Sequence, residues 1–597
     1  MPDVPAVPAM PARSSVPAMP VVSTARSRGT SQGETRVTHT QPTPSVVNEL
    51  ADRFWDAILE LDPTTATLYG DERFDDRLED PGPEGRARLR ALHETTLAAA
   101  VAIPDEGLQV EERITRDMIR VVCELGIEQN DQRMDLFKAV DQMAGPQTLL
   151  PQLTRFQPAD TPERLERFVV RLRAYPAYMA AIEGLLHEAA ATGLTQPRIV
   201  AERTISQVER LLGLPVEQSP IVSGAQVASE SDRERILELV RDVVRPADAS
   251  YLATLRDAYL PASREEPGLW SAPAGDALYR TQIRAWTTLA LDPVEVHRSG
   301  LEELEAIEEE RRAIARAEGF GDDTAAYRAA MAADPGNLPG TPGDLVDRAL
   351  EDIGRAFDAA QRWFGRLPRA GCEVRPVEPY KEADAPFAYY YPPNAGGSRP
   401  GTYYVNTYDL VSRTYSALAS TTYHEAVPGH HFQITLEMEH PELPAFRRLG
   451  SRLVGGAYAE GWGLYSERLA DEMGLYRTEA ERFAMLDAQA WRAARLVVDT
   501  GMHALRWGRQ QSIDLLLSAG LTRTNAVIET DRYIAWPAQA LTYKVGQREI
   551  ERLRRELAGR DGTRFDLRAF HDAVLGHGSL PLATLARELP AWLAPAV

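Results

Sequence analysis

The chain has 597 residues, of which 44% are hydrophobic and 26% are charged, so it can bury a substantial core and we predict a globular protein. Acidic residues outnumber basic ones by 87 to 66, which gives a formal net charge of −21. That charge has the wrong sign for binding nucleic acid or anionic lipid. Only two cysteines occur, too few for a disulfide scaffold or a thiolate cluster, so nitrogen and oxygen ligands must hold any metal.

The N-terminal segment, residues 1–45, consists largely of Pro, Ala, Ser, Thr and Val with almost no aromatic residues. Because such a composition buries too little apolar surface to offset the entropy of ordering, we predict a disordered tail. No run of 18 or more apolar residues occurs, and the N-terminus lacks the basic and then apolar pattern of a signal peptide. We therefore expect a cytoplasmic protein without a membrane partner.

Helical periodicity dominates from Val46 onward. Apolar residues recur at spacings of three and four in long segments, for example 46–63, 162–193 and 231–261. This pattern predicts a mainly α protein. We expect one domain over residues 46–597, with the alternative that two halves, about 46–290 and 291–597, flank a cleft.

Signals for β-strands concentrate in one segment, where aromatic and β-branched residues flank a stretch rich in Pro, Gly and Asn. This pattern predicts a small antiparallel element formed by Phe387–Tyr391 and Thr402–Thr407. The glycine-rich stretch 396–401 between them is either a flexible loop over a substrate or an ordinary turn.

The strongest chemical signal is the string TTYHEAVPGHHFQ, which places His424, Glu425, His430 and His431 within eight residues although the chain holds only 11 histidines. Hydrolytic zinc is bound by imidazoles and a carboxylate, with one open position for water. The common helical spacing places the second histidine four residues after the first, but here that position is Pro428. On a straight helix, neither later imidazole could share an ion with the first.

Pro428 and Gly429 offer a way around this geometry. Proline removes a helical hydrogen bond and glycine relaxes the backbone after it. We therefore expect a widened or bulged turn that brings the second imidazole back toward the first. Two other His-Glu pairs, beginning at His93 and His187, have no second histidine nearby, and we interpret both as solvated helix faces.

Several strings in the second half of the chain together resemble a bacterial family, the domain of unknown function numbered 885. They are HEAVPGHHFQ, AYAEGWGLYSERL, RYIAWPAQALTYKVGQ and FHDAVLGHGSLPL. The resemblance extends over nearly everything beyond the tail. That family is similar to helical zinc metallopeptidases of the gluzincin type. The resemblance therefore implies a large helical metallopeptidase-like body with its small β element beside an active-site cleft.

Carried over position by position, the resemblance implies that His424, His430 and Glu460 bind one zinc ion and that Glu425 is the general base. His431 remains open as an alternative ligand or as a residue that supports the ligands. Considered by itself, Glu460 lies among aromatic and glycine residues, where a carboxylate is partly buried and needs a partner, either a metal or an arginine.

A hydrolase of this kind also needs a hydrogen-bond donor for the oxyanion that forms during the reaction. The downstream candidates are polar side chains in apolar surroundings, namely Arg532, Tyr533, Tyr543 and His571. Peptidases similar to this family use a downstream tyrosine or histidine. The sequence does not rank Tyr543 above His571.

We therefore expect a zinc-dependent hydrolase that cleaves short peptides, in which Glu425 takes a proton from the attacking water and passes it to the leaving amine. Two alternatives remain. One is a zinc-dependent amidase or esterase acting on a non-peptide metabolite, and the other is a non-catalytic binding protein that keeps the fold. The motifs of serine hydrolases, phosphate-binding loops and dinucleotide-binding domains are absent from the sequence, which argues against those three classes.

Overall fold

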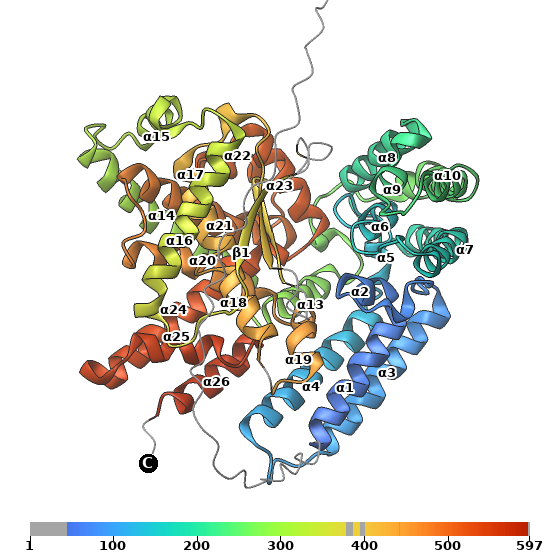
Figure 1. Cartoon of the computed structure of the whole chain (residues 1–597), viewed down its shortest axis with the longest axis horizontal. Helices are drawn as coiled ribbons and strands as arrows, with labels where there is room; N and C mark the ends of the chain where they lie inside the picture. The colour runs from blue at the N-terminus through green and yellow to red at the C-terminus, as the bar shows by residue number, and fades with distance from the viewer. Residues whose placement is uncertain (1–44, 378–381, 383–385, 394–399, 441, 595–597) are drawn as a thin grey trace, which may run out of the picture. The chain divides into compact units, whose positions relative to one another are not determined.

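The computed structural model describes residues 45–377, 382, 386–393, 400–440 and 442–594 (Figure 1). Except for Ser45, the predicted tail lies outside these ranges, as does most of the glycine-rich stretch 396–401. The Ser45 hydroxyl accepts a hydrogen bond from the Val47 amide at 3.2 Å. Such a cap satisfies one of the free amides of a helix start, and it begins the first helix.

The first half of the described chain is built from helices, as the periodicity predicts. Their bounds are α1 (Val46–Leu61), α2 (Pro63–Leu68), α3 (Pro83–Ala102), α4 (Val110–Asp131), α5 (Asp135–Lys138), α6 (Pro146–Leu153), α7 (Pro162–Thr192), α8 (Arg198–Gly213), α9 (Pro220–Gly224), α10 (Glu230–Leu239), α11 (Arg245–Thr254), α12 (Leu260–Ala262) and α13 (Gly275–Thr287). The predicted boundaries of α7 are confirmed: its first turn is capped by Thr161, and it ends at Gly193 in the left-handed conformation, which suits glycine.

The second half of the described chain is also helical. The bounds are α14 (Pro293–Ala317), α15 (Thr324–Ala333), α16 (Pro342–Trp363), α17 (Tyr415–Glu425), α18 (His430–Met438), α19 (Ala445–Leu449), α20 (Gly456–Glu472), α21 (Glu479–His503), α22 (Arg509–Ser518), α23 (Arg523–Ala535), α24 (Thr542–Asp561), α25 (Leu567–Leu575) and α26 (Leu582–Trp592). Helix α21 packs along α14 and also contacts α17 and α23, while α20 packs along α24. These contacts bring α17, α20, α21 and α24 together around the candidate site.

A three-stranded sheet lies beside α16, α17 and α18 (Figure 1). The predicted antiparallel pair is confirmed: β2 (Ala388–Tyr391) pairs with β3 (Gly401–Val405), with Tyr390 opposite Tyr403. The prediction missed a strand, β1 (Cys372–Pro376), which pairs with β3 in parallel and makes the sheet mixed. Its sequence CEVRP is short and partly charged, so it carries little strand signal of its own.

The buried cores join distant parts of the chain. One core contains Phe54 from α1 together with Trp462 from α20 and Phe570 from α25. A second contains Phe168 from α7 and Ile534 from α23. Both cores therefore cross the boundary that we drew near residue 290, and Ser45–Val597 form one compact unit.

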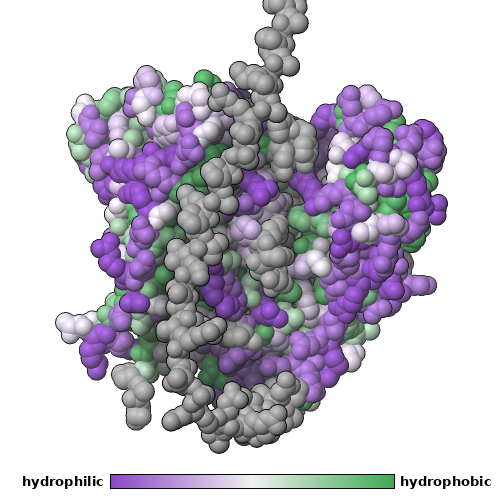
Figure 2. Space-filling model, viewed as in Figure 1, coloured by the Kyte–Doolittle hydropathy of each residue, from purple (hydrophilic) through white to green (hydrophobic). Residues whose placement is uncertain are grey.

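The face of the molecule in Figure 2 carries hydrophilic side chains over much of its described surface. Among the described residues, no helix combines the length and apolar character needed to cross a membrane. The fold is mainly α with a small β element, as predicted. The cleft that we expect beside the sheet stays a prediction.

Candidate metal centre

The helix is interrupted between the two predicted histidine ligands. Helix α17 ends at Glu425 and α18 begins at His430, so the expected widened turn is in fact a complete interruption of the helix. A Cβ atom on Gly429 would lie 1.8 Å from the His424 carbonyl oxygen, a separation that only glycine avoids. The Pro428 carbonyl accepts a hydrogen bond from Trp462 Nε1 at 2.8 Å, which fixes the connection to α20.

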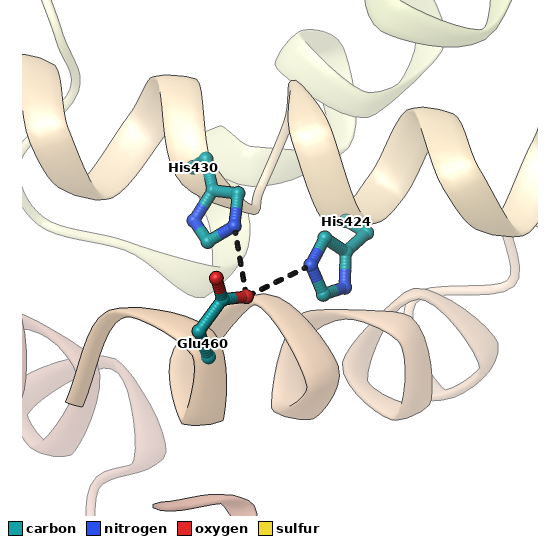
Figure 3. Close-up of side chains that lie close together, drawn as sticks. All are labelled: His424, His430 and Glu460. Atoms are coloured by element: carbon teal, nitrogen blue, oxygen red, sulfur yellow. Dashed lines mark ion pairs between the residues drawn. The ribbon is translucent and has the colours of Figure 1, made fainter. Parts of the chain in front are cut away.

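This break lets two imidazoles approach one carboxylate. Figure 3 shows His424 and His430, from neighbouring helices, both directed at Glu460 on α20. The Glu460 Oε2 atom lies 3.6 Å from His424 Nε2 and 3.5 Å from His430 Nε2. One ligand atom from each of the three residues lies within 4.8 Å of the other two. The three predicted ligands therefore converge.

The three side chains fit a zinc ion by donor type and by spacing. Zinc bonds of about 2.0–2.2 Å in a tetrahedral site place two ligand atoms about 3.3–3.6 Å apart. The two His–Glu separations, 3.6 Å and 3.5 Å, match that value and are too long for good hydrogen bonds. Two imidazoles and one carboxylate are also the ligand set of many catalytic zinc sites, and they leave one position open.

The ring of His424 is oriented by a residue that sequence reasoning missed. His424 Nδ1 donates a hydrogen bond to Glu467 Oε1 at 2.8 Å, so Nε2, which is directed at Glu460, is the nitrogen that the neutral ring would offer to a metal. Glu467 lies seven residues after Glu460, two turns along the same face of a helix. This spacing was the signal that could have identified it.

Further contacts hold Glu467 in turn. Gln489 Nε2 on α21 donates to Glu467 Oε2 at 3.0 Å, and the Lys544 ammonium group on α24 donates to Gln489 Oε1 at 2.9 Å. Gly463 lies under the imidazole, because a Cβ at this position would come within 2.9 Å of the His424 ring. The orientation of His424 thus depends on residues from three helices.

The carboxylates and imidazoles of the site shift each other's pKa, each favouring the charged form of the other. Burial disfavours protonation of His424, yet Glu460 and Glu467 outweigh that effect and raise its pKa to about 10. Burial acts to raise the pKa of Glu460, but the imidazoles of His424 and His430 hold it well below its usual range. The same negative potential attracts a divalent cation, which displaces the proton when it binds.

Glu425 lies next to this set and is only partly buried. Burial raises the pKa of its carboxyl, although the charges of His430 and His424 oppose the shift. Unlike the carboxylates of Glu460 and Glu467, the carboxylate of Glu425 makes no hydrogen bond or ion pair within the described part of the chain. Its carboxylate is therefore available to a water molecule or a substrate.

Of the predicted oxyanion donors, Tyr543 on α24 lies beside His424, and Arg532 and Tyr533 lie on α23. The Tyr543 ring stacks beside the His424 ring, with centroids 6.3 Å apart. Arg532 donates to Gln539 Oε1 at 2.8 Å and lies 3.5 Å from Glu529. Tyr533 is buried, and its hydroxyl donates to Glu529 at 2.6 Å, so this hydroxyl proton is not available to an oxyanion.

His571 lies elsewhere, in the core. It is fully buried, its Nδ1 donates to the Trp363 carbonyl at 3.0 Å, and its Nε2 accepts from the Tyr465 hydroxyl at 2.9 Å. Its ring stacks on Phe364 with centroids 4.9 Å apart, and burial lowers its pKa to about 4. The structure does not bring His571 to the metal-binding set. Both of its nitrogens are occupied, which is the arrangement of a structural histidine.

His431 is also occupied on both nitrogens. Its Nε2 donates to the Ala370 carbonyl at 3.1 Å, and its Nδ1 accepts from the Tyr390 hydroxyl at 2.8 Å. It is fully buried and links α18 to the sheet. Of the two adjacent histidines, the structure therefore turns His430 toward Glu460 and His431 away.

The two remaining His-Glu pairs differ from each other. His187 on α7 is exposed, as predicted. The interpretation of His93 as a solvated residue was wrong, since it is only 6% exposed and lies 6.1 Å from the Phe54 ring. A helical pattern around a histidine does not reveal which neighbouring helix covers it.

Comparisons with known proteins agree with the fold. The family described as "Bacterial protein of unknown function (DUF885)" matches residues 63–589. A crystal structure from Colwellia psychrerythraea, described as a "putative lipoprotein", is 28% identical, with a TM-score of 0.85 over 92% of this chain and 98% of that one. A second "putative lipoprotein of unknown function", from Shewanella oneidensis, is 19% identical, with a TM-score of 0.73 over 91% and 99%, and shows the fold alone. No curated protein matches.

Proposed function

The chain belongs to the bacterial DUF885 family, and from the geometry of its metal centre we propose that it is a zinc-dependent hydrolase that cleaves short peptides. One observation carries the proposal: His424, His430 and Glu460 converge, with the free carboxylate of Glu425 beside them. A binding protein without turnover has no evident need for that fourth carboxylate. The likeness to gluzincin peptidases is part of this proposal.

In this proposal each residue has one task. Zinc held by His424, His430 and Glu460 supplies Lewis-acid activation of water and of a substrate carbonyl. Glu425 accepts the proton of the attacking water and delivers it to the leaving amine. We assign the oxyanion donor role to Tyr543, because its ring stacks beside His424 whereas His571 is buried and saturated.

A peptide-library digest of the purified protein, combined with elemental analysis, tests the proposal. We expect one zinc ion per chain and cleavage of library peptides. Cleavage of small amides or esters with an untouched peptide library would instead identify an amidase or esterase. Absence of turnover on all three substrate classes would leave a non-catalytic binding protein.

The general-base role is tested by Glu425→Gln. Because this change removes a proton acceptor but none of the three ligands, we expect zinc content to stay at one ion per chain and kcat to fall about 10²–10⁴-fold. Glu472→Gln is the matched control, since Glu472 lies at the outer end of α20 and pairs with Arg554. Undiminished turnover in the Glu425 variant would remove this residue from the mechanism.

A further inference from the structure

Three arginines gather beside the candidate metal centre. Arg492 and Arg495 lie one turn apart on α21, and both guanidinium groups lie over the Trp491 ring, at 4.3 Å and 4.5 Å from its centroid. Arg495 also lies 4.2 Å from the centroid of Tyr543, the ring that stacks beside His424. Arg532 on α23 belongs to the same cluster, because Glu529 lies within ion-pair distance of both Arg495 and Arg532.

The arginines outnumber the acids that pair with them. Glu529 lies 3.1 Å from Arg495 and 3.5 Å from Arg532, so one carboxylate serves two guanidinium groups. Arg492 has no ion pair within the described residues, and its only hydrogen bond there is a long one, 3.4 Å, to the Ala488 carbonyl. The cluster therefore has an excess of positive charge.

Hydrogen-bond donors are left over as well. Arg492 Nε, Arg495 Nη1 and Arg532 Nε are buried and have no hydrogen-bond partner among the described residues. The Arg495 side chain is only 2% exposed. A buried cation with unsatisfied donors is costly unless an anion compensates it.

Other buried arginines show how this charge is normally balanced. Arg171, which is fully buried, donates to four acceptors from residues 67–157. Arg311 and Arg447 each leave one nitrogen unpaired, but Arg311 lies within ion-pair distance of both Glu308 and Asp487, at 3.2 Å and 2.6 Å, and Arg447 lies 3.4 Å from Glu111. Arg492 differs from these arginines, because it has no carboxylate within ion-pair distance among the described residues, and its neighbours Arg495 and Arg532 share Glu529.

The cluster is also linked by packing to the metal-binding set. Helix α21, which carries Arg492 and Arg495, packs against α17, which ends at Glu425. The Arg495 guanidinium group lies 4.2 Å from the Tyr543 ring centroid, and that ring lies 6.3 Å from the His424 ring. The cluster therefore lies beside the residues that we propose bind the metal.

We propose that Arg492, Arg495 and Arg532 form a subsite that binds a carboxylate group of the substrate next to the metal centre. The inference rests on the proposed peptidase function and specifies its substrate class. Planar guanidinium groups are well suited to binding a carboxylate through two parallel hydrogen bonds. The Tyr543 ring centroid lies 4.2 Å from the Arg495 guanidinium group and 6.3 Å from the His424 ring centroid, so about three extended residues can span the separation between Arg495 and His424.

Two sources of that carboxylate are chemically equivalent at the subsite. It is either the free C-terminus of a peptide, which makes the protein a carboxypeptidase that removes short C-terminal fragments, or an acidic side chain near the scissile bond. The test must therefore separate terminal from side-chain carboxylates.

Affinity selection provides that test without requiring turnover. The Glu425→Gln protein, loaded with zinc, is exposed to two N-acetylated pentapeptide libraries that differ only in ending with a free carboxylate or a carboxamide. Mass spectrometry measures the retained fraction. We expect retention of the free acids to exceed that of the amides by about 10–100-fold, as a charged hydrogen-bonded pair requires. Preference for amides that contain Asp or Glu would instead assign the subsite to a side-chain carboxylate.

Variants in the cluster should abolish the preference. When Arg492→Ala is added to the Glu425→Gln protein, the retention of free acids relative to amides should fall close to one. Arg492→Lys in the same protein should restore part of that preference, because the positive charge returns. Arg482→Ala is the matched control, since Arg482 lies on the same helix but pairs with Asp471 and Glu479, and the ratio should not change.

Equal retention of carboxylate-bearing and carboxylate-free peptides, or an unchanged ratio in Arg492→Ala, would overturn the subsite. The outcome is independent of the hydrolase proposal. Selective retention without turnover in the unmodified protein would support the subsite and contradict hydrolysis. Cleavage of acids and amides at equal rates would support hydrolysis and contradict the subsite.

Discussion

Helix α20 contacts a different histidine on each of two sides, and the surroundings of the two histidines are opposite in character. On one side, Glu460 and Glu467 face His424, and one imidazole nitrogen is bonded while the other is directed at a carboxylate 3.6 Å away. On the other side, Trp462 and Tyr465 contact His571, whose two nitrogens are both bonded. The comparison shows that a buried histidine becomes available to a metal only where its surroundings leave one nitrogen unsatisfied.

The difference originates in the neighbouring residues. The Trp363 carbonyl and the Tyr465 hydroxyl occupy both nitrogens of His571, and burial favours the neutral ring and lowers its pKa to about 4. Carboxylates surround His424 and raise its pKa to about 10 despite burial. The negative charge that favours a proton on His424 would also favour the divalent cation that we propose there, and His571 has no such charge beside it in the described structure.

The largest effect is expected on the metal-facing side. His424→Ala and Glu460→Ala each remove one of three protein ligands, so we expect zinc affinity to fall about 100-fold or more. Elemental analysis after dialysis measures the zinc content. His187→Ala is the control, because His187 is an exposed residue of α7. A full zinc ion per chain in either variant would exclude that residue from the coordination sphere.

A smaller effect on the same side tests the role of orientation. Glu467→Gln keeps the shape of the side chain but weakens the acceptor for His424 Nδ1, so zinc affinity should fall about 10–100-fold without complete loss. Competition with a chelator measures the affinity. Glu472→Gln, five residues later on α20, should leave it unchanged. Identical affinities in the two variants would show that Glu467 does not orient the ligand.

The smallest effect on zinc is expected from the aromatic side. His571→Ala leaves a cavity, removes the donor to the Trp363 carbonyl and removes the acceptor of the Tyr465 hydroxyl proton, although Arg554 still donates to the Tyr465 oxygen. The free energy of unfolding should therefore fall by about 2–4 kcal/mol. Zinc content should stay at one ion per chain. Denaturant unfolding and elemental analysis together measure both quantities. Loss of zinc with unchanged stability would reverse the assignment of the two sides.

Local patterns predicted much of this protein. The spacing of apolar residues predicted the helices, and the aromatic run around Tyr390 predicted the β2–β3 pair, because both signals are contained within one segment. The strand β1 escaped prediction since its partner lies 29 residues away in sequence and its own residues are weak strand formers. Elements defined by distant pairing leave little trace locally.

The same limit applies to the site. The cluster of histidines around Pro428 and the distant Glu460 identified the three converging ligands, with help from the family resemblance. Glu467 was missed although it lies on the same helix face as Glu460, seven residues later. Arg492 and Arg495 were missed because each acquires its role only from the helices that pack against α21. His571 was included for its polar group in an apolar context, yet that context is also what saturates a core histidine.

The sequence by itself determined the helical class, a disturbance of the helix at Pro428 and Gly429, and the chemical types of the proposed metal ligands, since these follow from backbone geometry and side-chain chemistry over short distances. Only the tertiary structure decided that His430 rather than His431 faces Glu460, that Glu467 orients His424, and that Arg495 and Arg532 share Glu529. These outcomes depend on which atoms are left without partners after the helices pack, and packing is a property of the whole chain.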